Sequence, residues 1–377
     1  MSMDTKIQHG YLILADISGY TAFLAGSELD HAHEVMSELL ELIIERFQSA
    51  LTLSKLEGDA VFAYAPESKL PRGETLIELI ESTYVAFKDR VEAVHRRTTC
   101  TCAACRAIPI LDLKFMAHHG DYIFQKAAGI TELIGSDVNL VHRLLKNHIK
   151  EATGWNAYAL FTEKCLDHLS LKPEGMHAGT ETYEHLGEVQ THSLNLRARY
   201  KELTETRHIV VTRDEALITT ALHYPVSPTV VWDWINDPHR RAQYTLQPGL
   251  EFRAILRPGG RTGVGARNHC MHGKDQAMEE DILDWKPFDY LTVVQKFWGF
   301  TMLMTAKLTP TADGTQLEIF IKGRSPVPGF LNRPMFVLML TKVFPMAKLF
   351  ENMGRCIAEE MAREQDEILL PVMAVTG

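Results

Sequence analysis

The sequence predicts an α+β protein with two domains, each built from an antiparallel sheet and helices. At 377 residues the chain is long for a single hydrophobic core. Residues 10–195 follow the order strand, helix, strand, strand, helix, strand, which is typical of a ferredoxin-like layer with extensions. The pattern changes around residues 200–215, where the stretch RARYKELTETRHIVVTRDEAL is charged and only weakly periodic and is interpreted as a linker. A series of strands and a long helix follows. We therefore expect domains at residues 1–205 and 206–377, the second a curled sheet around one long helix.

Composition narrows the class of protein. The net charge of -9 argues against a broad nucleic-acid-binding surface. No run of about 20 apolar residues is present to span a membrane, and residues 1–10 are too polar for a signal peptide. Three of the six cysteines fall within residues 100–105, unlike the spread of a secreted disulfide scaffold. We expect a cytoplasmic protein with reduced thiols that binds no nucleic acid.

In the first half, residues 10–16 are apolar and predict a buried strand. Helical spacing of apolar residues predicts amphipathic helices over residues 31–50 and 73–96. Between them, residues 51–66 predict a hairpin that turns at Gly58 and Asp59.

The next segment, residues 111–127, predicts a strand pair that turns near Gly120 and Asp121. Residues 135–149 predict a helix with Ser136 or Asp137 as its N-cap. A strand and a short helix follow over residues 155–169, and closing strands over 183–196. In the second half we expect a strand at 216–226, a helix at 227–244, strands to about 322 and a helix over roughly 333–366.

Two acidic residues stand where strands end. Asp16 closes the first strand, and Asp59 lies in the predicted hairpin turn. If these strands are neighbours, the carboxylates converge and suit Mg²⁺, and pairs of such ions serve phosphoryl and nucleotidyl transfer. The turn after Asp16 offers backbone N–H groups at a helix start, which suits a polyphosphate. Strand-end acids are also commonly just solvated, so neither aspartate is informative alone.

Asn139 and Arg143 are four residues apart and share one face of the predicted helix. An arginine suits the charge that develops on a reacting phosphate, and an asparagine suits a ribose oxygen. A solvent-facing polar stripe would show the same spacing.

Four stretches together resemble the class III adenylyl and guanylyl cyclases. They are YLILADISGYTAFL, KLEGDAVFAY, LKFMAHHGDYIFQ and ELIGSDVNLVHRLLKN. Each motif is weak by itself, but the four occur in the family's order and with its spacing over residues 10–195. This ordered coincidence makes the resemblance specific.

The resemblance implies a role for each matched position. Asp16 and Asp59 would hold two Mg²⁺ or Mn²⁺ ions per site. Asn139 would orient the ribose, and Arg143 would stabilise the transition state. The remaining positions would bind substrate, the first two of them at the purine: Lys55, Glu132, Ile17, Ser18, Gly19 and Tyr20.

The purine-reading pair also implies a substrate. A lysine that donates to ring N1 and a carboxylate that accepts from the exocyclic amine together read adenine, although Glu132 is larger than the family's usual residue there. The resemblance therefore implies an adenylyl cyclase that forms cyclic AMP and pyrophosphate from ATP. In this family the metal ligands come from one subunit and the other site residues from its partner, so a homodimer is implied.

The cysteine-rich segment CTCAAC is not typical of these cyclases, although a bacterial subgroup of uncharacterised cyclase-like proteins looks similar here. Cys100, Cys102 and Cys105, with His95, could bind Zn²⁺ tetrahedrally. Free thiols in a loop are the alternative.

Residues 215–365 resemble the START-like, polyketide-cyclase-type (SRPBCC) ligand-binding superfamily. The resemblance rests on HYPVSPTVVWDWINDPHRRAQY, DGTQLEIFIKGR and the final long helix. It implies a cavity between sheet and helix that binds a small apolar ligand. Asn268, Cys270 and His272 share one strand face, which could be a cavity wall or a metal pocket. Six aromatic residues could line the cavity or belong to the core: Trp232, Trp234, Trp285, Phe297, Trp298 and Phe300.

Three functions are compatible with these patterns. The first is an active adenylyl cyclase regulated by an apolar ligand in its second domain. The second is a catalytically inactive sensor that binds nucleotide and ligand. The third is an enzyme that acts on polyketide-like substrates in the second domain, where we identify no acid–base pair.

Overall fold

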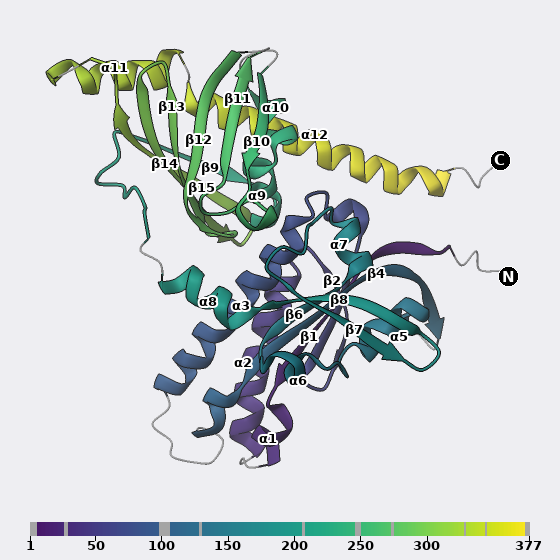
Figure 1. Cartoon of the computed structure of the whole chain (residues 1–377). Coiled ribbons are helices and arrows are strands. Elements are labelled where there is room, and N and C mark those ends of the chain that lie inside the picture. The colour runs from purple at the N-terminus through teal and green to yellow at the C-terminus, as the bar shows by residue number, and fades with distance from the viewer. Residues whose placement is uncertain are drawn as a thin grey trace. The chain divides into compact units, whose positions relative to one another are not determined.

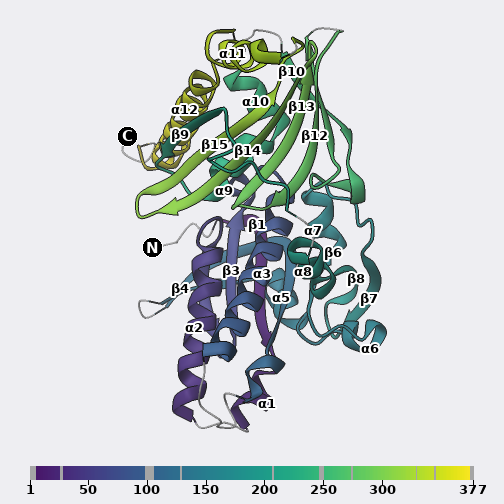
Figure 2. The ribbon, with the colours of Figure 1, turned by 90° about the vertical axis from the view of Figure 1, so that its left-hand side faces the viewer.

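The computed structural model describes residues 6–25, 29–97, 106–127, 130–205, 208–245, 250–272, 275–327, 329–343 and 345–373. The chain forms two compact units, Met1–Thr206 and Arg207–Gly377, each with its own sheet (Figures 1 and 2). The mixed α+β class predicted from the sequence is confirmed. No helix in the described ranges is both long and apolar enough to cross a membrane.

The sheet of the first unit has eight described strands. Seven follow the order β2-β3-β1-β4-β6-β8-β7, and β5 pairs with β4. Neighbours are antiparallel except β4 and β6, which run parallel. The strands are β1 Gln8–Ser18, β2 Thr52–Glu57, β3 Ala60–Pro66, β4 Asp112–Ala127, β5 Ile130–Ile134, β6 Tyr158–Thr162, β7 His177–Tyr183 and β8 Gly187–Asn195.

Helices cover both faces of this sheet, which explains why β1 is apolar without alternation. Leu12 and Leu14 pack in one buried cluster with Val141 of α5. On β4, Phe115 lies 6.1 Å from Phe47 of α2, measured between ring centroids. The helices are α1 Tyr20–Ala25, α2 Leu29–Phe47, α3 Glu74–Arg97, α5 Ser136–Arg143, α6 Ile149–Thr153, α7 Glu163–His168 and α8 Leu196–Glu205, with 3-10 turns η1 Glu67–Lys69 and η2 Ile108–Ile110.

The turn predicted at Gly120 and Asp121 is wrong, because β4 continues through both residues. Gly120 instead permits a close approach of α5: a Cβ atom there would lie 2.3 Å from Oδ2 of Asp137. The same oxygen accepts a hydrogen bond from the Asp121 N–H at 2.7 Å. Asp137 is therefore committed to β4. Neither it nor Ser136 caps the helix, whose N-cap is Gly135.

The charged stretch expected to begin the linker is also structured. Residues 196–205 form α8, which is tied to α3 by an ion pair at 2.8 Å between Arg199 and Glu81. The hydroxyl of Tyr200 donates to Asp89 of α3 at 3.0 Å. The charges that suggested a linker thus hold this helix on the first unit.

The second unit contains a seven-stranded antiparallel sheet in the order β10-β11-β12-β13-β14-β15-β9. Two helices replace the one expected at 227–244, because Pro238 starts a new helix that Asp237 caps. The expected C-terminal helix is divided near Pro345, which cannot donate a helical hydrogen bond. The strands are β9 Ile218–Tyr224, β10 Leu250–Leu256, β11 Arg267–His272, β12 Asp275–Lys286, β13 Tyr290–Phe297, β14 Phe300–Thr311 and β15 Gly314–Arg324. The helices are α9 Pro228–Asn236, α10 Pro238–Tyr244, α11 Asn332–Leu338 and α12 Met346–Met373, with a π turn at Met339–Val343.

Candidate functional site

The two predicted metal ligands meet at one end of the first sheet. Asp16 on β1 pairs in register with Ala60 of β3, and Asp59 is the residue just before Ala60. The Ile17 N–H donates to the Asp59 carbonyl at 3.2 Å, which holds the β2–β3 turn against β1. Partial burial raises the pKa of the Asp59 carboxyl, and the nearby Asp16 carboxylate raises it further. The two carboxylates are therefore close enough to repel each other.

Lys114 is a site residue that the sequence reasoning missed. It faces Asp16 across the β1–β4 register, and its Nζ lies 2.9 Å from Asp16 Oδ2. Burial lowers the pKa of Lys114, but the ion pair with Asp16 outweighs burial, so the pKa is raised. A charged residue inside an otherwise apolar strand was the available signal, because such a charge needs a partner.

The turn after Asp16 has the backbone conformation that glycine favours. Gly19 has a φ of 89°, and its carbonyl accepts from the Phe23 N–H as α1 begins at Tyr20. Ser18 donates through Oγ to the Asn156 carbonyl at 3.3 Å. The N–H of Ile17 is already paired with Asp59, so this amide is not free for a phosphate.

The two predicted purine-reading residues also lie together. Lys55 on β2 and Glu132 on β5 come from distant parts of the sequence, yet Nζ and Oε1 are 4.0 Å apart. Lys55 also makes a shorter ion pair with Glu57, at 2.9 Å, and this hydrogen bond raises the pKa of the lysine. The ammonium group of Lys55 and the carboxylates of Glu57 and Glu132 therefore form one partly exposed cluster.

Glu57, which the sequence reasoning did not single out, links this group to α5. Its second carboxylate oxygen lies 3.1 Å from Nδ1 of His142, the residue just before Arg143. Burial lowers the pKa of His142. The purine-reading pair and the end of α5 are therefore neighbours within one chain.

Asn139 and Arg143 both stand on α5 and both are exposed. Within the described ranges, neither makes a hydrogen bond or an ion pair with Asp16 or Asp59. One chain therefore brings together two groups: the aspartates with Lys114, and Lys55 and Glu132 beside α5.

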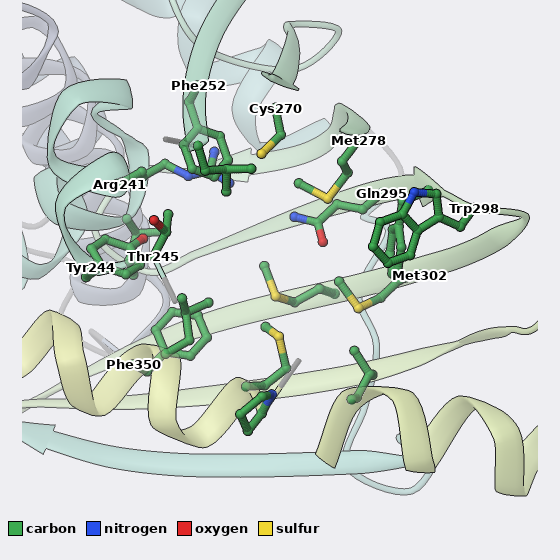
Figure 3. Close-up of a pocket in the computed structure, with 18 residues that line it drawn as sticks. Arg241, Tyr244, Thr245, Phe252, Cys270, Met278, Gln295, Trp298, Met302 and Phe350 are labelled. Carbon is green, nitrogen blue, oxygen red and sulfur yellow. The ribbon is translucent and has the colours of Figure 1, made fainter. Parts of the chain in front are cut away.

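The second unit contains a cavity of about 170 Å³ beneath α12 (Figure 3). Phe297 and Trp298 line it, whereas Trp232, Trp234 and Trp285 are buried core residues, and Phe300 is not among the lining residues. Four methionines contribute to the wall, together with other apolar side chains: Met278, Met302, Met304 and Met346.

One end of this cavity is polar. Arg241 pairs with the buried Glu280 through two hydrogen bonds of 2.6 and 2.9 Å. Asn268 also donates to Glu280, at 2.8 Å, while Cys270 lines the cavity directly. Asn268 thus belongs to a buried hydrogen-bond network and is not among the residues that line the cavity. The side chain of His272 lies outside the described residues.

The predicted cysteine site is not covered by the structure. Cys100, Cys102 and Cys105 lie outside the described residues, and His95 is an exposed residue near the end of α3.

Comparisons with known proteins give one relative and several solved structures. A family model described as "Protein of unknown function (DUF2652)" matches residues 36–153. The "Uncharacterized protein Rv2561/Rv2562" of Mycobacterium tuberculosis is 34% identical over 167 residues, which cover 43% of this chain and 73% of the relative.

Among solved structures, a bacterial light-regulated adenylyl cyclase matches with 11% identity and a TM-score of 0.41, over 52% of this chain and 53% of that one. The chain thus spans about half the length of that structure. The adenylyl cyclase CyaB from P. aeruginosa matches with 15% identity and a TM-score of 0.38, over 51% of this chain and 95% of that one. Values this low describe a likeness and do not establish an activity. The sequence identity, in contrast, establishes kinship: the chain belongs to the same family as the Mycobacterium tuberculosis protein Rv2561/Rv2562.

Proposed function

We propose that the first unit is the catalytic domain of a nucleotidyl cyclase that converts ATP to cyclic AMP and pyrophosphate. The observation that carries this proposal is the meeting of Asp16 and Asp59 at one end of the sheet. Two of the four ordered motifs supply these aspartates. Two neighbouring carboxylates repel each other, and this repulsion raises the pKa of Asp59. An isolated, solvated acid at the end of a strand would not have this unfavourable neighbour.

The aspartates fit divalent cations. Their oxygens are the ligands that Mg²⁺ and Mn²⁺ prefer, and their mutual repulsion is a cost that a bound cation would relieve. When bound, the ions would make the ribose 3′-hydroxyl more acidic and neutralise charge on the triphosphate. Asp16 and Asp59 would hold the ions, and Lys114 would keep Asp16 oriented through its ion pair.

The remaining residues would bind and orient the nucleotide. Lys55 would donate to adenine N1, and Glu132 would accept from the exocyclic amine, a pattern that guanine does not match. Asn139 would hold the ribose. Arg143 would stabilise the negative charge that develops at the α-phosphate, because its exposed guanidinium has no ion-pair partner among the described residues. Ser18, Gly19 and Tyr20 would contact the phosphates.

The active site proposed here is shared between two chains. A homodimer would place the aspartates of one chain opposite Asn139 and Arg143 of the other. What supports this proposal is that, among the described residues of one chain, neither Asn139 nor Arg143 makes a hydrogen bond or an ion pair with Asp16 or Asp59.

We further propose that the second unit is a START-like domain that senses a small apolar ligand. The cavity with its methionine-rich wall supports this reading, because methionine side chains adapt to apolar ligands of varied shape. A ligand would change activity only if it bound one arrangement of the dimer better than another.

A turnover assay tests the catalytic proposal. Purified full-length protein is given ATP or GTP with Mg²⁺ or Mn²⁺, and cyclic nucleotide is measured by mass spectrometry. We expect cyclic AMP from ATP and a loss of at least about 100-fold in Asp59→Ala. Asp214→Ala, which removes an exposed carboxylate from the second unit, is the matched control and should remain active. A folded protein that binds nucleotide but forms no product would leave the inactive sensor as the function.

A further inference from the structure

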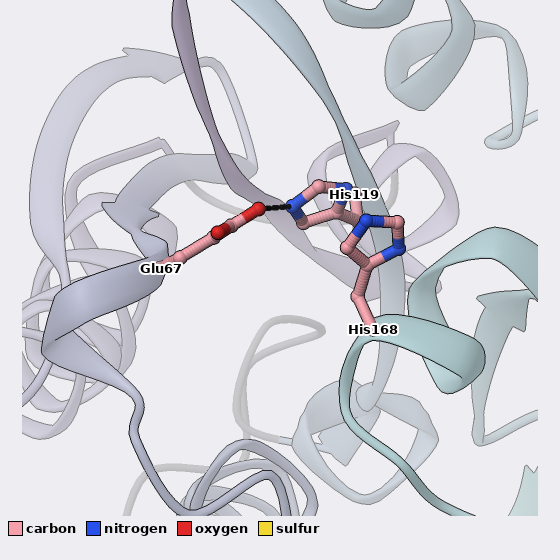
Figure 4. A group of neighbouring side chains, drawn as sticks. All are labelled: Glu67, His119 and His168. Atoms are coloured by element: carbon pink, nitrogen blue, oxygen red, sulfur yellow. Dashed lines mark hydrogen bonds and ion pairs between the residues drawn. The ribbon is translucent and has the colours of Figure 1, made fainter.

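A second cluster of potential metal ligands lies apart from the proposed nucleotide site. Glu67 of η1, His119 of β4 and His168 of α7 each place one ligand atom within 4.8 Å of the others (Figure 4). Glu67 Oε1 lies 2.7 Å from Nε2 of His119. The two imidazole rings are stacked, with centroids 3.6 Å apart. Three segments distant in sequence thus converge on one point.

His119 carries an unexplained polar atom. The side chain is 4% exposed, and its Nδ1 is buried without a hydrogen-bond partner. Because the Glu67 carboxylate accepts hydrogen bonds, Nε2 of the neutral ring carries the proton, and Nδ1 presents a bare lone pair. A buried nitrogen of this kind usually indicates a water molecule or an ion. Burial also lowers the pKa of His119, the direction that favours the neutral ring.

The tautomer of His168 is fixed in the complementary way. Its Nδ1 lies 2.9 Å from the Lys164 carbonyl, which can only accept, so Nδ1 carries the proton. Nε2 is then a second bare lone pair, on a ring stacked against His119. A histidine that ligates a metal commonly donates its other N–H to a carboxylate or a backbone carbonyl, and both histidines do so here.

We propose that His119 and His168 bind a divalent transition-metal ion through ring nitrogens, with Glu67 orienting His119 from behind. Zinc–nitrogen bonds are about 2.0–2.1 Å long, so the ligand atoms must approach more closely than in the stacked arrangement. His168 is exposed, so its side chain can move toward His119 while Glu67 keeps its hydrogen bond to that ring. Water would complete the coordination. The ion would join η1, β4 and α7 and stabilise the first unit.

Zinc binding to the full chain tests this site independently of cyclase activity. The protein carries Cys100→Ser, Cys102→Ser and Cys105→Ser to remove the cysteine-rich segment as a ligand. Excess Mg²⁺ occupies the aspartates. Zinc is titrated against a chelating dye, bound metal is counted by mass spectrometry, and thermal unfolding is followed in parallel.

We expect one zinc ion per chain and a higher melting temperature with zinc. His168→Ala should abolish both effects, and Glu67→Ala should weaken binding about 10–100-fold, as for other groups that orient a ligand. His239→Ala, which removes an exposed histidine of α10, should change neither. The proposal is overturned if the cysteine-free protein binds no zinc, or if His168→Ala binds zinc as tightly as His239→Ala.

Discussion

The carboxylate of Asp59 shows how one residue can serve a site at the expense of the fold. Its pKa is raised by burial and by Asp16, so the folded chain binds this proton more tightly than the unfolded chain does. The stability of the folded state therefore falls as pH rises through the ordinary carboxyl range, and it stays lower above that range. Removing the negative charge of Asp59 should therefore stabilise the folded protein and abolish the proposed cyclase activity.

Asp59→Asn tests this trade-off. At pH 7 the variant should unfold at a temperature roughly 2 °C higher than the parent. The difference should shrink as pH falls towards about 3, where Asp59 becomes protonated in the unfolded chain as well as in the folded chain. Thermal unfolding at a series of pH values in metal-free buffer measures it. A lower melting temperature for the variant at pH 7 would contradict the account.

Glu280 is the opposite case, a buried carboxylate whose charge is fully compensated. Burial opposes ionisation, but Arg241 and the hydrogen bonds from Gln295 and Asn268 outweigh it and lower the pKa to about 2. The stabilisation is present above the ordinary carboxyl pKa and is lost as pH falls from about 4.5 towards 2.

Glu280→Gln should reduce the free energy of unfolding of the second unit by about 3–5 kcal/mol, because Arg241 is left buried without a counter-charge. Urea unfolding of the full chain, followed by tryptophan fluorescence, measures the loss. Glu318→Gln removes a more exposed partner of Arg213 and should cost less than about 1 kcal/mol. If both substitutions lower the unfolding free energy by the same amount, the buried pair of Arg241 and Glu280 contributes no more to stability than an exposed ion pair.

Individual residues were predictable where a motif fixed their positions. Lys55 and Glu132 were paired from their places in two motifs, and the structure brings their side chains to 4.0 Å. Lys114 and Glu57 were missed because each contacts the site through a residue that is distant in sequence. Lys114 pairs with Asp16, and Glu57 pairs with His142, and neither contact can be read from the sequence alone. His119 and His168 were missed because no known spacing links them.

At the scale of elements, α5 carries two proposed site residues and is held on the sheet through Asp137. The pKa of Asp137 is lowered to about 2, chiefly by its hydrogen bond with His118 and also by the bond from the Asp121 N–H. Gly120 makes room for this carboxylate. The placement of Asn139 and Arg143 thus depends on a glycine in a neighbouring strand.

Gly120→Ala should displace Asp137 and with it the start of α5. We expect a loss of about 1–3 kcal/mol in unfolding free energy, as for other overpacked sites, together with reduced nucleotide turnover. Urea unfolding and the cyclic-nucleotide assay measure the two effects. Gly263→Ala is the control, because a Cβ atom there has no neighbour within 4 Å. A Gly120→Ala protein as stable as the Gly263→Ala protein would show that α5 tolerates the shift.

The same glycine explains one limit of prediction from sequence. A Gly-Asp pair between apolar stretches indicates a turn, but the need for space beneath α5 arises only from tertiary packing. Residues 197–205 were assigned to a linker for a similar reason, since the partners that hold α8 lie on α3, more than 100 residues earlier. The long amphipathic helices were predictable because their periodicity is local.

At the scale of the whole molecule, the sequence predicted two α+β parts, and the structure contains two compact units with separate sheets. The proposed nucleotide site needs residues from two copies of the chain. Among the described residues of one chain, Asn139 and Arg143 make no hydrogen bond or ion pair with the aspartates, and we propose a dimer in which the two groups complete each other.

Mixing two inactive variants tests this central claim most directly. Asp59→Ala lacks one group and Arg143→Ala lacks the other, and each alone should form almost no cyclic AMP. After the two are unfolded and refolded together, half of the dimers are mixed and each holds one intact site, so about a quarter of the parent activity should return. The same recovery is expected if the two chains are co-expressed. No recovery in demonstrably mixed dimers, or full activity in either variant alone, would contradict a nucleotide-cyclising site shared between two chains.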